Sequence, residues 1–97
     1  FGAKLDCQAA TSYTGYTQSD DEPLVITVVE ACKRLGLKPV VGSTGGGSDA
    51  NFTAALGCPT LDGLGPVGEG AHALTEQIDL CQLLPRIALV AGVLVRL

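Results

Sequence analysis

This sequence contains no methionine and no cluster of basic residues, and each absence narrows what the protein can be. Without a single methionine in 97 residues, Phe1 cannot be a native start, so we expect a processed or excised piece of a longer chain. Six lysines and arginines stand against ten acidic residues, and the net charge of -4 argues against a nucleic-acid partner. The longest apolar run, residues 87–95, falls far short of the ~20 residues that span a bilayer, and no signal-like start is present. We therefore expect no membrane partner either.

Paired cysteine motifs are also lacking. Cys7, Cys32, Cys58 and Cys81 are widely separated, form no CxxC pair and each lie in an apolar run. This pattern favours buried, reduced thiols over a disulfide framework or a zinc-thiolate cluster. We therefore expect a cytoplasmic protein.

What the chain has in excess is apolar surface. Apolar residues make up 46% of the sequence, charged residues only 16%, and the mean hydropathy is +0.35. A free-standing domain of this size needs less apolar surface than this. We expect part of that surface to be covered by something else.

The first nineteen residues look distinct from the rest. Apolar and polar residues alternate over 3–9, which predicts a strand with one buried face. The hydroxyl-rich stretch 11–19 has no helical or strand period, so we interpret it as a linker and a domain boundary. This divides the chain into residues 1–19 and 20–97.

The next segment predicts a helix followed by a buried strand. Asp20 or Asp21 can cap the helix at its amino end, and Gly36 can take the left-handed position at its carboxyl end. A wide apolar stripe between these two ends indicates packing against a sheet. Residues 38–41 then read as a short strand, and the order helix, turn, strand is typical of α/β layering.

The remaining elements continue this alternation. A short helix is predicted over 49–56 with Ser48 as its cap, and a strand over 58–61. Residues 62–71 contain four glycines and a proline, which is typical of a loop with special backbone conformations. A long helix, apolar on most sides and starting at a cap on Asp79, is predicted over 80–97.

The glycine-rich segment GSTGGGSD lies between a predicted strand and a predicted helix, where backbone N–H groups can converge on an anion. It is not a Walker loop, because Asp49 follows Ser48 where a lysine and a hydroxyl residue are needed. Nor is it GxGxxG, because Ala50 replaces the third glycine. Two interpretations stay open. The segment is either a tight connection without a ligand, or a loop in which Gly45 to Gly47 let a polar or carboxylate group approach main-chain N–H groups.

The only histidine, His72, follows the glycine-rich loop 62–71, which we expect to aim its ring rather than leave it free to swing. Zinc needs three or four protein ligands, so any further ligands must lie outside this chain. Asp62, Glu69 or Glu76 could orient its second ring nitrogen. A Ser48–His72–Asp62 triad is disfavoured because the GxSxG elbow is absent.

The stretch GGGSDANF, the stretch GCPTLDGLGP and the following GAH together resemble the carboxy-terminal part of the co-catalytic di-zinc exopeptidases. This family includes carboxypeptidase G, aminoacylase, acetylornithine deacetylase and succinyl-diaminopimelate desuccinylase. The resemblance covers residues 20–97, and residues 1–10 are similar in character to the last strand of that family's lid and dimerisation domain. The fold it implies is α/β, namely the carboxy-terminal part of a three-layer α/β/α catalytic domain preceded by one lid strand.

The resemblance also assigns roles to residues. His72 matches the family's last zinc ligand. The residues that match its substrate-side loop, or stand next to it, are Gly46, Gly47, Ser48, Asp49 and Asn51. Asn51 stands where several desuccinylase-like members have an arginine, so it would offer amide hydrogen bonds instead of charge. The general base and the other zinc ligands come earlier in that family, so no catalytic residue is expected in these 97 residues.

The resemblance implies that the parent polypeptide hydrolyses small peptides or N-acyl amino acids. Two zinc ions would activate a water molecule there, and an upstream glutamate would take its proton. The isolated piece should be inactive. Its partner would be the missing amino-terminal part of the same polypeptide, and the parent would form a homodimer. The alternative is a non-catalytic interaction module, in which the apolar last helix binds a partner chain and His72 is structural.

Overall fold

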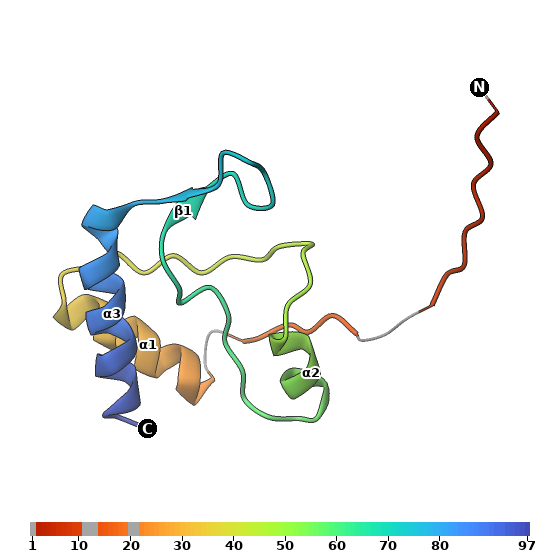
Figure 1. Cartoon of the computed structure of the whole chain (residues 1–97). Coiled ribbons are helices and arrows are strands. Elements are labelled where there is room, and N and C mark those ends of the chain that lie inside the picture. The colour runs from red at the N-terminus through yellow and green to blue at the C-terminus, as the bar shows by residue number, and fades with distance from the viewer. Residues whose placement is uncertain (1, 11–13, 20–21) are drawn as a thin grey trace.

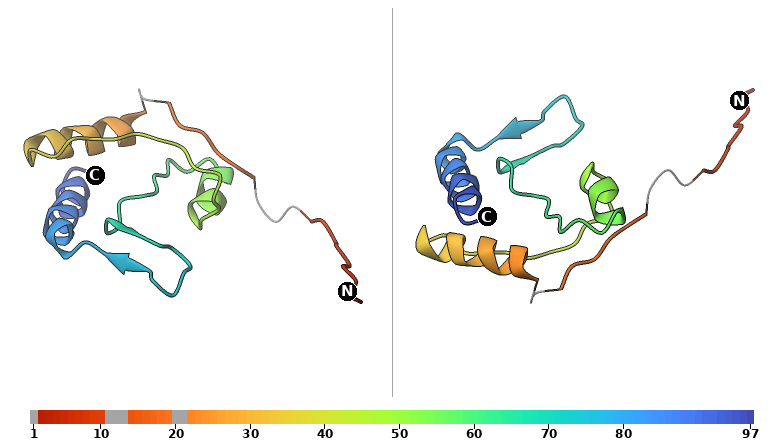
Figure 2. Two further views of the ribbon diagram at one scale, coloured as in Figure 1. Left: turned by 90° about the horizontal axis from the view of Figure 1, so that it is seen from above. Right: turned by 90° about the horizontal axis from the view of Figure 1, so that it is seen from below.

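Two helices packed against each other form the apolar core of the chain. The computed structural model describes residues 2–10, 14–19 and 22–97. Helix α1, Pro23–Arg34, contacts helix α3, Leu80–Leu94, and the two lie side by side in Figures 1 and 2. The buried cluster between them consists of Ala31, Cys32, Leu89 and Val93, with Val28, Leu37 and Leu64 packed at its edge.

Helix α1 ends as the sequence predicts. Gly36 adopts a left-handed φ of 68°, and its N–H donates to the Lys33 carbonyl at 3.1 Å. The N–H of Leu37 donates to the Cys32 carbonyl at 2.9 Å, which completes a Schellman motif and turns Leu37 toward the core. At the other end, the predicted caps Asp20 and Asp21 lie outside the described residues. Glu22 occupies the cap position without a side-chain hydrogen bond to the helix.

Helix α3 starts at the predicted cap. The Asp79 carboxylate accepts a hydrogen bond from the N–H of Cys81 at 2.9 Å. The helix contains Pro85 and stops at Leu94, three residues before the predicted end at 97. Its apolar residues lie on all sides of the helix axis, and only one side faces the core. Leu89 on that side is 1% exposed, whereas Leu84 on another side is 74% exposed.

Helix α2, Ala50–Ala55, is the short second helix, slightly shorter than the predicted 49–56. In Figure 1 it lies apart from α1 and α3, on the side toward the N-terminal residues. Gly57 follows it at a φ of 79°, and the N–H of Cys58 donates to the Thr53 carbonyl at 3.2 Å. Gly57, directly after the predicted span 49–56, therefore ends this helix in a left-handed conformation.

The predicted strands are not formed. Residues 3–9, 38–41 and 58–61 are irregular in the structure and mostly exposed. A strand is held by hydrogen bonds to a neighbouring strand, and these three segments pair with no part of the described chain. The sheet that does form is an antiparallel hairpin of β1, Gly68–Glu69, and β2, Gln77–Ile78. Strand β1 lies within the predicted loop 62–71, and β2 follows that loop.

Mixed helices and a small sheet are compatible with the predicted α/β class. The three-layer arrangement, the origin of residues 1–10 in a lid domain and the division at residue 19 stay predictions. The radius of gyration, 17.1 Å, exceeds the about 13 Å expected of a compact domain of this length. Large apolar side chains are exposed along the chain, among them Leu56, Leu74 and Leu80. The expected excess of apolar surface is therefore present on this chain.

Cysteine burial was predicted correctly at one position out of four. Cys32 is buried in the core, whereas Cys7, Cys58 and Cys81 are exposed, and all four thiols are unpaired. Cys7 and Cys58 are exposed because the strands expected to bury them are not formed. Among the described residues, no helix combines the length and apolar character that crossing a membrane requires.

Truncation of Leu89 tests the core. We expect Leu89→Ala to lower the free energy of unfolding by about 2–5 kcal/mol, because it removes a buried side chain from the α1–α3 contact. Leu84→Ala on the same helix should change it by less than about 0.5 kcal/mol, because Leu84 is exposed. Urea unfolding of the chain, followed by circular dichroism, measures both values. Equal losses for the two variants would contradict this core.

Candidate functional site

The predicted substrate-side loop is an open connection that leads into α2. Residues 42–47 are exposed, and the N–H of Gly46 donates to the Thr44 hydroxyl at 3.3 Å. A methyl group added at Gly42 or Gly45 would meet no other atom within 4 Å, and neither glycine has a positive φ. The chain's own packing therefore does not require these two glycines.

Ser48 and Asn51 tie the start of α2 together. The Ser48 hydroxyl accepts a hydrogen bond from the N–H of Ala50 at 3.1 Å, and the Asn51 amide oxygen accepts from the N–H of Ser48 at 3.0 Å. The Asn51 amide nitrogen donates to the Thr14 carbonyl at 2.9 Å. Asn51 is only 8% exposed, so its amide joins α2 to the segment 14–19 from a buried position.

Asp62 lies beside Ser48, although the two residues are fourteen positions apart. The hydrogen bond from the Ser48 hydroxyl and the one from the Gly63 N–H lower the pKa of Asp62, and slight burial opposes them. The N–H of Gly63 donates to the Asp62 carboxylate at 2.7 Å. The structure thus brings together two members of the disfavoured triad.

Arg86 of α3 holds the chain that follows Asp62. Its Nε donates to the Gly65 carbonyl at 2.7 Å, and its Nη2 donates to the Gly63 carbonyl. A planar guanidinium can bind two carbonyls of one loop at the same time. The sequence reading missed this residue, because nothing in its local pattern distinguishes it from a solvated helix arginine.

His72 lies in the loop that joins β1 to β2. Its backbone φ of 66° lies in the left-handed region. Histidine tolerates this conformation better than most residues, but it still costs about 1–2 kcal/mol. The loop is closed by a hydrogen bond from the N–H of Ala73 to the Gly70 carbonyl at 2.9 Å. The side chain itself is exposed. The backbone of His72 is therefore held by the loop, and the expectation that the loop aims the ring stays a prediction.

None of the acidic residues near His72 has a hydrogen bond to it among the described residues. Glu69 accepts a hydrogen bond from the Gln77 amide at 2.6 Å across the hairpin, and Asp62 is bound to Ser48 and Gly63. Glu76 is exposed. The interpretation that one of these acids orients the imidazole is not supported by any contact in the described residues.

The described residues do not fit a complete metal site. They contain no group of three or more histidine, cysteine, aspartate or glutamate side chains close enough to hold an ion. His72 supplies one exposed imidazole, and a stable zinc site needs three or four ligands. As a ligand, His72 could therefore contribute only one donor to a site whose other donors lie elsewhere.

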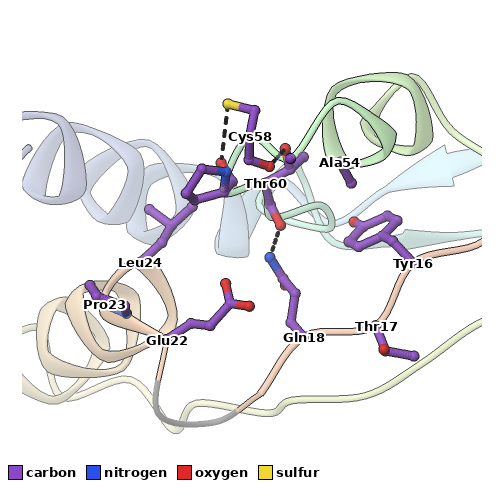
Figure 3. A pocket seen from close by; sticks show the side chains of 11 residues that line it. Tyr16, Thr17, Gln18, Glu22, Pro23, Leu24, Ala54, Cys58 and Thr60 are labelled. Carbon is purple, nitrogen blue, oxygen red and sulfur yellow. Dashed lines mark hydrogen bonds between the residues drawn. The ribbon is translucent and has the colours of Figure 1, made fainter.

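A shallow hollow lies away from the predicted site residues (Figure 3). It is formed between the segment 16–18, the start of α1 and the chain that follows α2. The Gln18 amide crosses it and donates to the Thr60 carbonyl. None of the residues predicted to bind substrate or metal lines it, and it presents no cluster of reactive side chains.

Comparison with known proteins places these features in a family. A sequence model described as "Peptidase_M20: Peptidase family M20/M25/M40" matches residues 4–96. The succinyl-diaminopimelate desuccinylase of Albidiferax ferrireducens is 36% identical over 85 residues, covering 84% of this chain and 21% of the relative. The enzyme of the same name from Polaromonas naphthalenivorans is 39% identical over 76 residues, covering 73% and 18%. No solved structure matches the chain significantly.

A third relative is a Bacillus subtilis protein named YqjE and described as uncharacterized. It is 26% identical over 93 residues, covering 96% of this chain and 25% of the relative. The chain thus spans about a quarter or less of the length of the curated relatives that it matches.

Substitution at Gly68 tests the hairpin that carries His72. A methyl group at Gly68 would lie 2.2 Å from the Gln77 carbonyl oxygen, so Gly68→Ala should break the β1–β2 pairing. We expect the amide of Asp79, which donates to the Val67 carbonyl at 2.8 Å beside this pair, to lose its protection from hydrogen exchange, as measured by NMR. Gly65→Ala is the matched control, because a methyl group there meets nothing within 4 Å. Retained protection in Gly68→Ala would contradict the hairpin.

Titration of Asp62 tests its contact with Ser48. The pKa of Asp62 lies below its ordinary value of 3.8, so its hydrogen bonds stabilise the fold above pH 3.8 and are lost as the pH falls through the lowered pKa. In Ser48→Ala the midpoint should rise toward 3.8, because the larger of the two lowering contacts is removed. Ser43→Ala, at an exposed position in the same loop, should leave it unchanged. Carbon-13 NMR of the Asp62 carboxyl measures each midpoint, and an unmoved midpoint in Ser48→Ala would refute the contact.

Proposed function

The chain belongs to peptidase family M20/M25/M40, and we propose on that basis that it is the carboxy-terminal segment of a zinc-dependent exopeptidase or amidohydrolase. The parent polypeptide would cleave small peptides or N-acyl amino acids. The observation that carries the proposal is the family match over residues 4–96, which includes both the glycine-rich loop and His72. The named relatives at 36% and 39% identity, both desuccinylases, support hydrolysis of an amide bond.

His72 is the proposed metal ligand of this segment. Its left-handed backbone supports the assignment, because strained conformations of this kind persist where the surroundings hold them and gather at functional sites. Its exposure is compatible with a donor that reaches toward ligands on another part of the polypeptide. Members of this family are generally metal-dependent, and two zinc ions in the parent would supply a Lewis acid for the scissile carbonyl. The segment itself supplies no general base.

The glycine-rich loop is the proposed substrate contact. Its predicted residues are Gly46, Gly47, Ser48, Asp49 and Asn51. Because the chain's own packing does not require Gly42 or Gly45, the open surface there is available to another molecule. Main-chain N–H groups ahead of α2 can donate to a carboxylate or carbonyl oxygen of the substrate. The loop would thus bind the polar end of a small peptide or acyl amino acid.

The remaining proposals concern the parent polypeptide. Residues 1–19 would be the end of its lid and dimerisation domain, and the missing amino-terminal part would be the main partner of residues 20–97. The exposed apolar side chains support such a partner, since they leave a large surface to be covered. We further propose a cytoplasmic homodimer that binds neither nucleic acid nor membranes.

The alternative is a non-catalytic interaction module. The observation that favours it is the exposed apolar surface of α3, where Leu80 and Leu84 are 72% and 74% exposed. On this alternative α3 binds another protein and His72 has no metal to hold. The two proposals differ in metal content, which can be measured directly.

Metal analysis of the full-length polypeptide that carries this chain separates the two. We expect bound zinc and hydrolysis of N-succinyl-diaminopimelate, N-acetyl-glutamate or alanyl-glutamate, with the activity lost on chelation and restored by zinc. His72→Ala should lower kcat/KM by more than about 100-fold, beyond the loss typical of residues that only support a ligand. Thr75→Ala in the same loop is the control and should stay within about twofold.

The 97-residue chain alone should hydrolyse none of these compounds. Full-length protein that lacks metal, or whose activity survives both chelation and His72→Ala, would defeat the hydrolase proposal and leave the interaction module.

A further inference from the structure

The hairpin that carries His72 is not held in place by apolar packing. Every residue from 68 to 79 is exposed, so burial contributes little to its position. Strand β1 pairs with β2, and the loop between them is closed by hydrogen bonds from the Ala73 N–H to the Gly70 carbonyl and from the Glu76 N–H to the Ala73 carbonyl. These bonds fix the shape of the hairpin. Its place on the rest of the chain depends on how its two ends are attached.

The two ends of the hairpin are attached to α3 in different ways. Strand β2 runs directly into α3, because Ile78 is followed by the cap residue Asp79, and Figure 1 shows the hairpin leaving the start of this helix. The Asp79 N–H also donates to the Val67 carbonyl at 2.8 Å. The chain that enters β1 comes from residues 63–66 and has no such direct link to the helix. Its attachment therefore needs contacts made by side chains.

Arg86 of α3 attaches this entering segment. Its Nε donates to the Gly65 carbonyl at 2.7 Å, and its Nη2 donates to the Gly63 carbonyl. Leu64, between these two carbonyls, packs at the edge of the α1–α3 core. Pro66 follows, and its ring fixes its own φ, so little rotational freedom is left between the bound carbonyls and β1. Arg86 therefore restrains the second end of the hairpin.

His72 is the residue for which this restraint matters. Among the residues that the structure describes, it is the one non-glycine residue with a positive φ. A backbone conformation that costs energy persists only where its surroundings hold it. A side chain in the loop of an exposed hairpin also moves with the hairpin, so a rotation at the base would displace the imidazole.

We propose that Arg86 is a positioning residue for His72. By binding the carbonyls of Gly63 and Gly65, it fixes the second end of the hairpin on α3 and so sets where the imidazole lies. The inference rests on the proposed function for what the imidazole does, and it deepens that function by naming the helix residue on which the position of His72 depends. Two carbonyls of one segment need two donors in a fixed plane, which a guanidinium provides and an ammonium group does not.

Hydrogen exchange of the full-length protein without substrate tests the attachment. Arg86→Gln should speed exchange in peptides covering 66–79 about tenfold, the effect of losing about one hydrogen bond. Peptides covering α1 should exchange as in the wild type, which separates local release from general unfolding. Arg96→Gln is the matched control, because it removes the same charge from an arginine whose Nη1 donates to the Gly92 carbonyl of α3 itself. Unchanged exchange at 66–79, or equally faster exchange in α1, would overturn the proposal.

Kinetics of the same full-length protein, with whichever of the three compounds above it hydrolyses, test the effect on His72. Arg86→Gln should lower kcat by about 10–100-fold, the loss typical of residues that orient a ligand, with KM within about twofold. Arg86→Lys should stay within about threefold of Arg86→Gln, because lysine keeps the charge but not the paired donors. Recovery of the wild-type kcat in Arg86→Lys would overturn the proposal.

A double variant tests whether Arg86 acts through the hairpin. Gly68→Ala should break the β1–β2 pairing, so adding Arg86→Gln to it should lower kcat further by less than about threefold. If the two losses multiply in full, Arg86 acts elsewhere and the proposal is wrong.

The result for His72→Ala separates this inference from the proposed function. If His72→Ala leaves activity unchanged while Arg86→Gln speeds exchange at 66–79, the attachment is supported and the proposed function alone fails. If His72→Ala removes activity while Arg86→Gln leaves kcat unchanged, the proposed function stands and this inference fails.

Discussion

The contact between α1 and α3 is the constraint on which the rest of this chain depends. Ala31 and Leu89 are each 1% exposed, so the two helices meet closely at these residues. A methyl group at Gly92 would come within 4.0 Å of the Ala31 side chain, which shows how near the two helices approach. No other pair of helices is in contact among the described residues. Everything else is therefore attached to this pair by hydrogen bonds and chain connectivity, with little apolar burial of its own.

Those hydrogen bonds place the candidate site. Asp79, at the cap of α3, donates its N–H to the Val67 carbonyl at 2.8 Å and so sets the hairpin that carries His72. About two turns further along α3, Arg86 holds the segment 63–65 through the carbonyls of Gly63 and Gly65. The hairpin that carries His72 and the segment 63–65 are thus both attached to α3 by hydrogen bonds. A helix with an apolar core face and one well-placed arginine can organise two loops that have no core of their own.

Local signals predicted the helices well and the strands poorly. The caps at Asp79 and Gly36 involve residues a few positions away, so they can be read from sequence, and both are confirmed. The expected strand at 38–41 depends on a neighbouring strand, and the described chain offers it none. The hairpin was missed because its two strands are only two residues long and carry no alternating pattern. For the site, the local sequence predicted the glycine-rich loop and His72 as candidates, whereas Arg86 has no local signature at all.

The sequence by itself determined the family, because the glycine-rich loop and the histidine stand in a specific order that does not depend on how the chain is packed. It also determined where α1, α2 and α3 begin and end to within a few residues. Only the tertiary structure decided that Asp62 meets Ser48, that Asn51 is buried against Thr14, and that the His72 ring is exposed. These facts depend on contacts between residues far apart in the chain, and such contacts are set by packing and loop closure that no local pattern encodes.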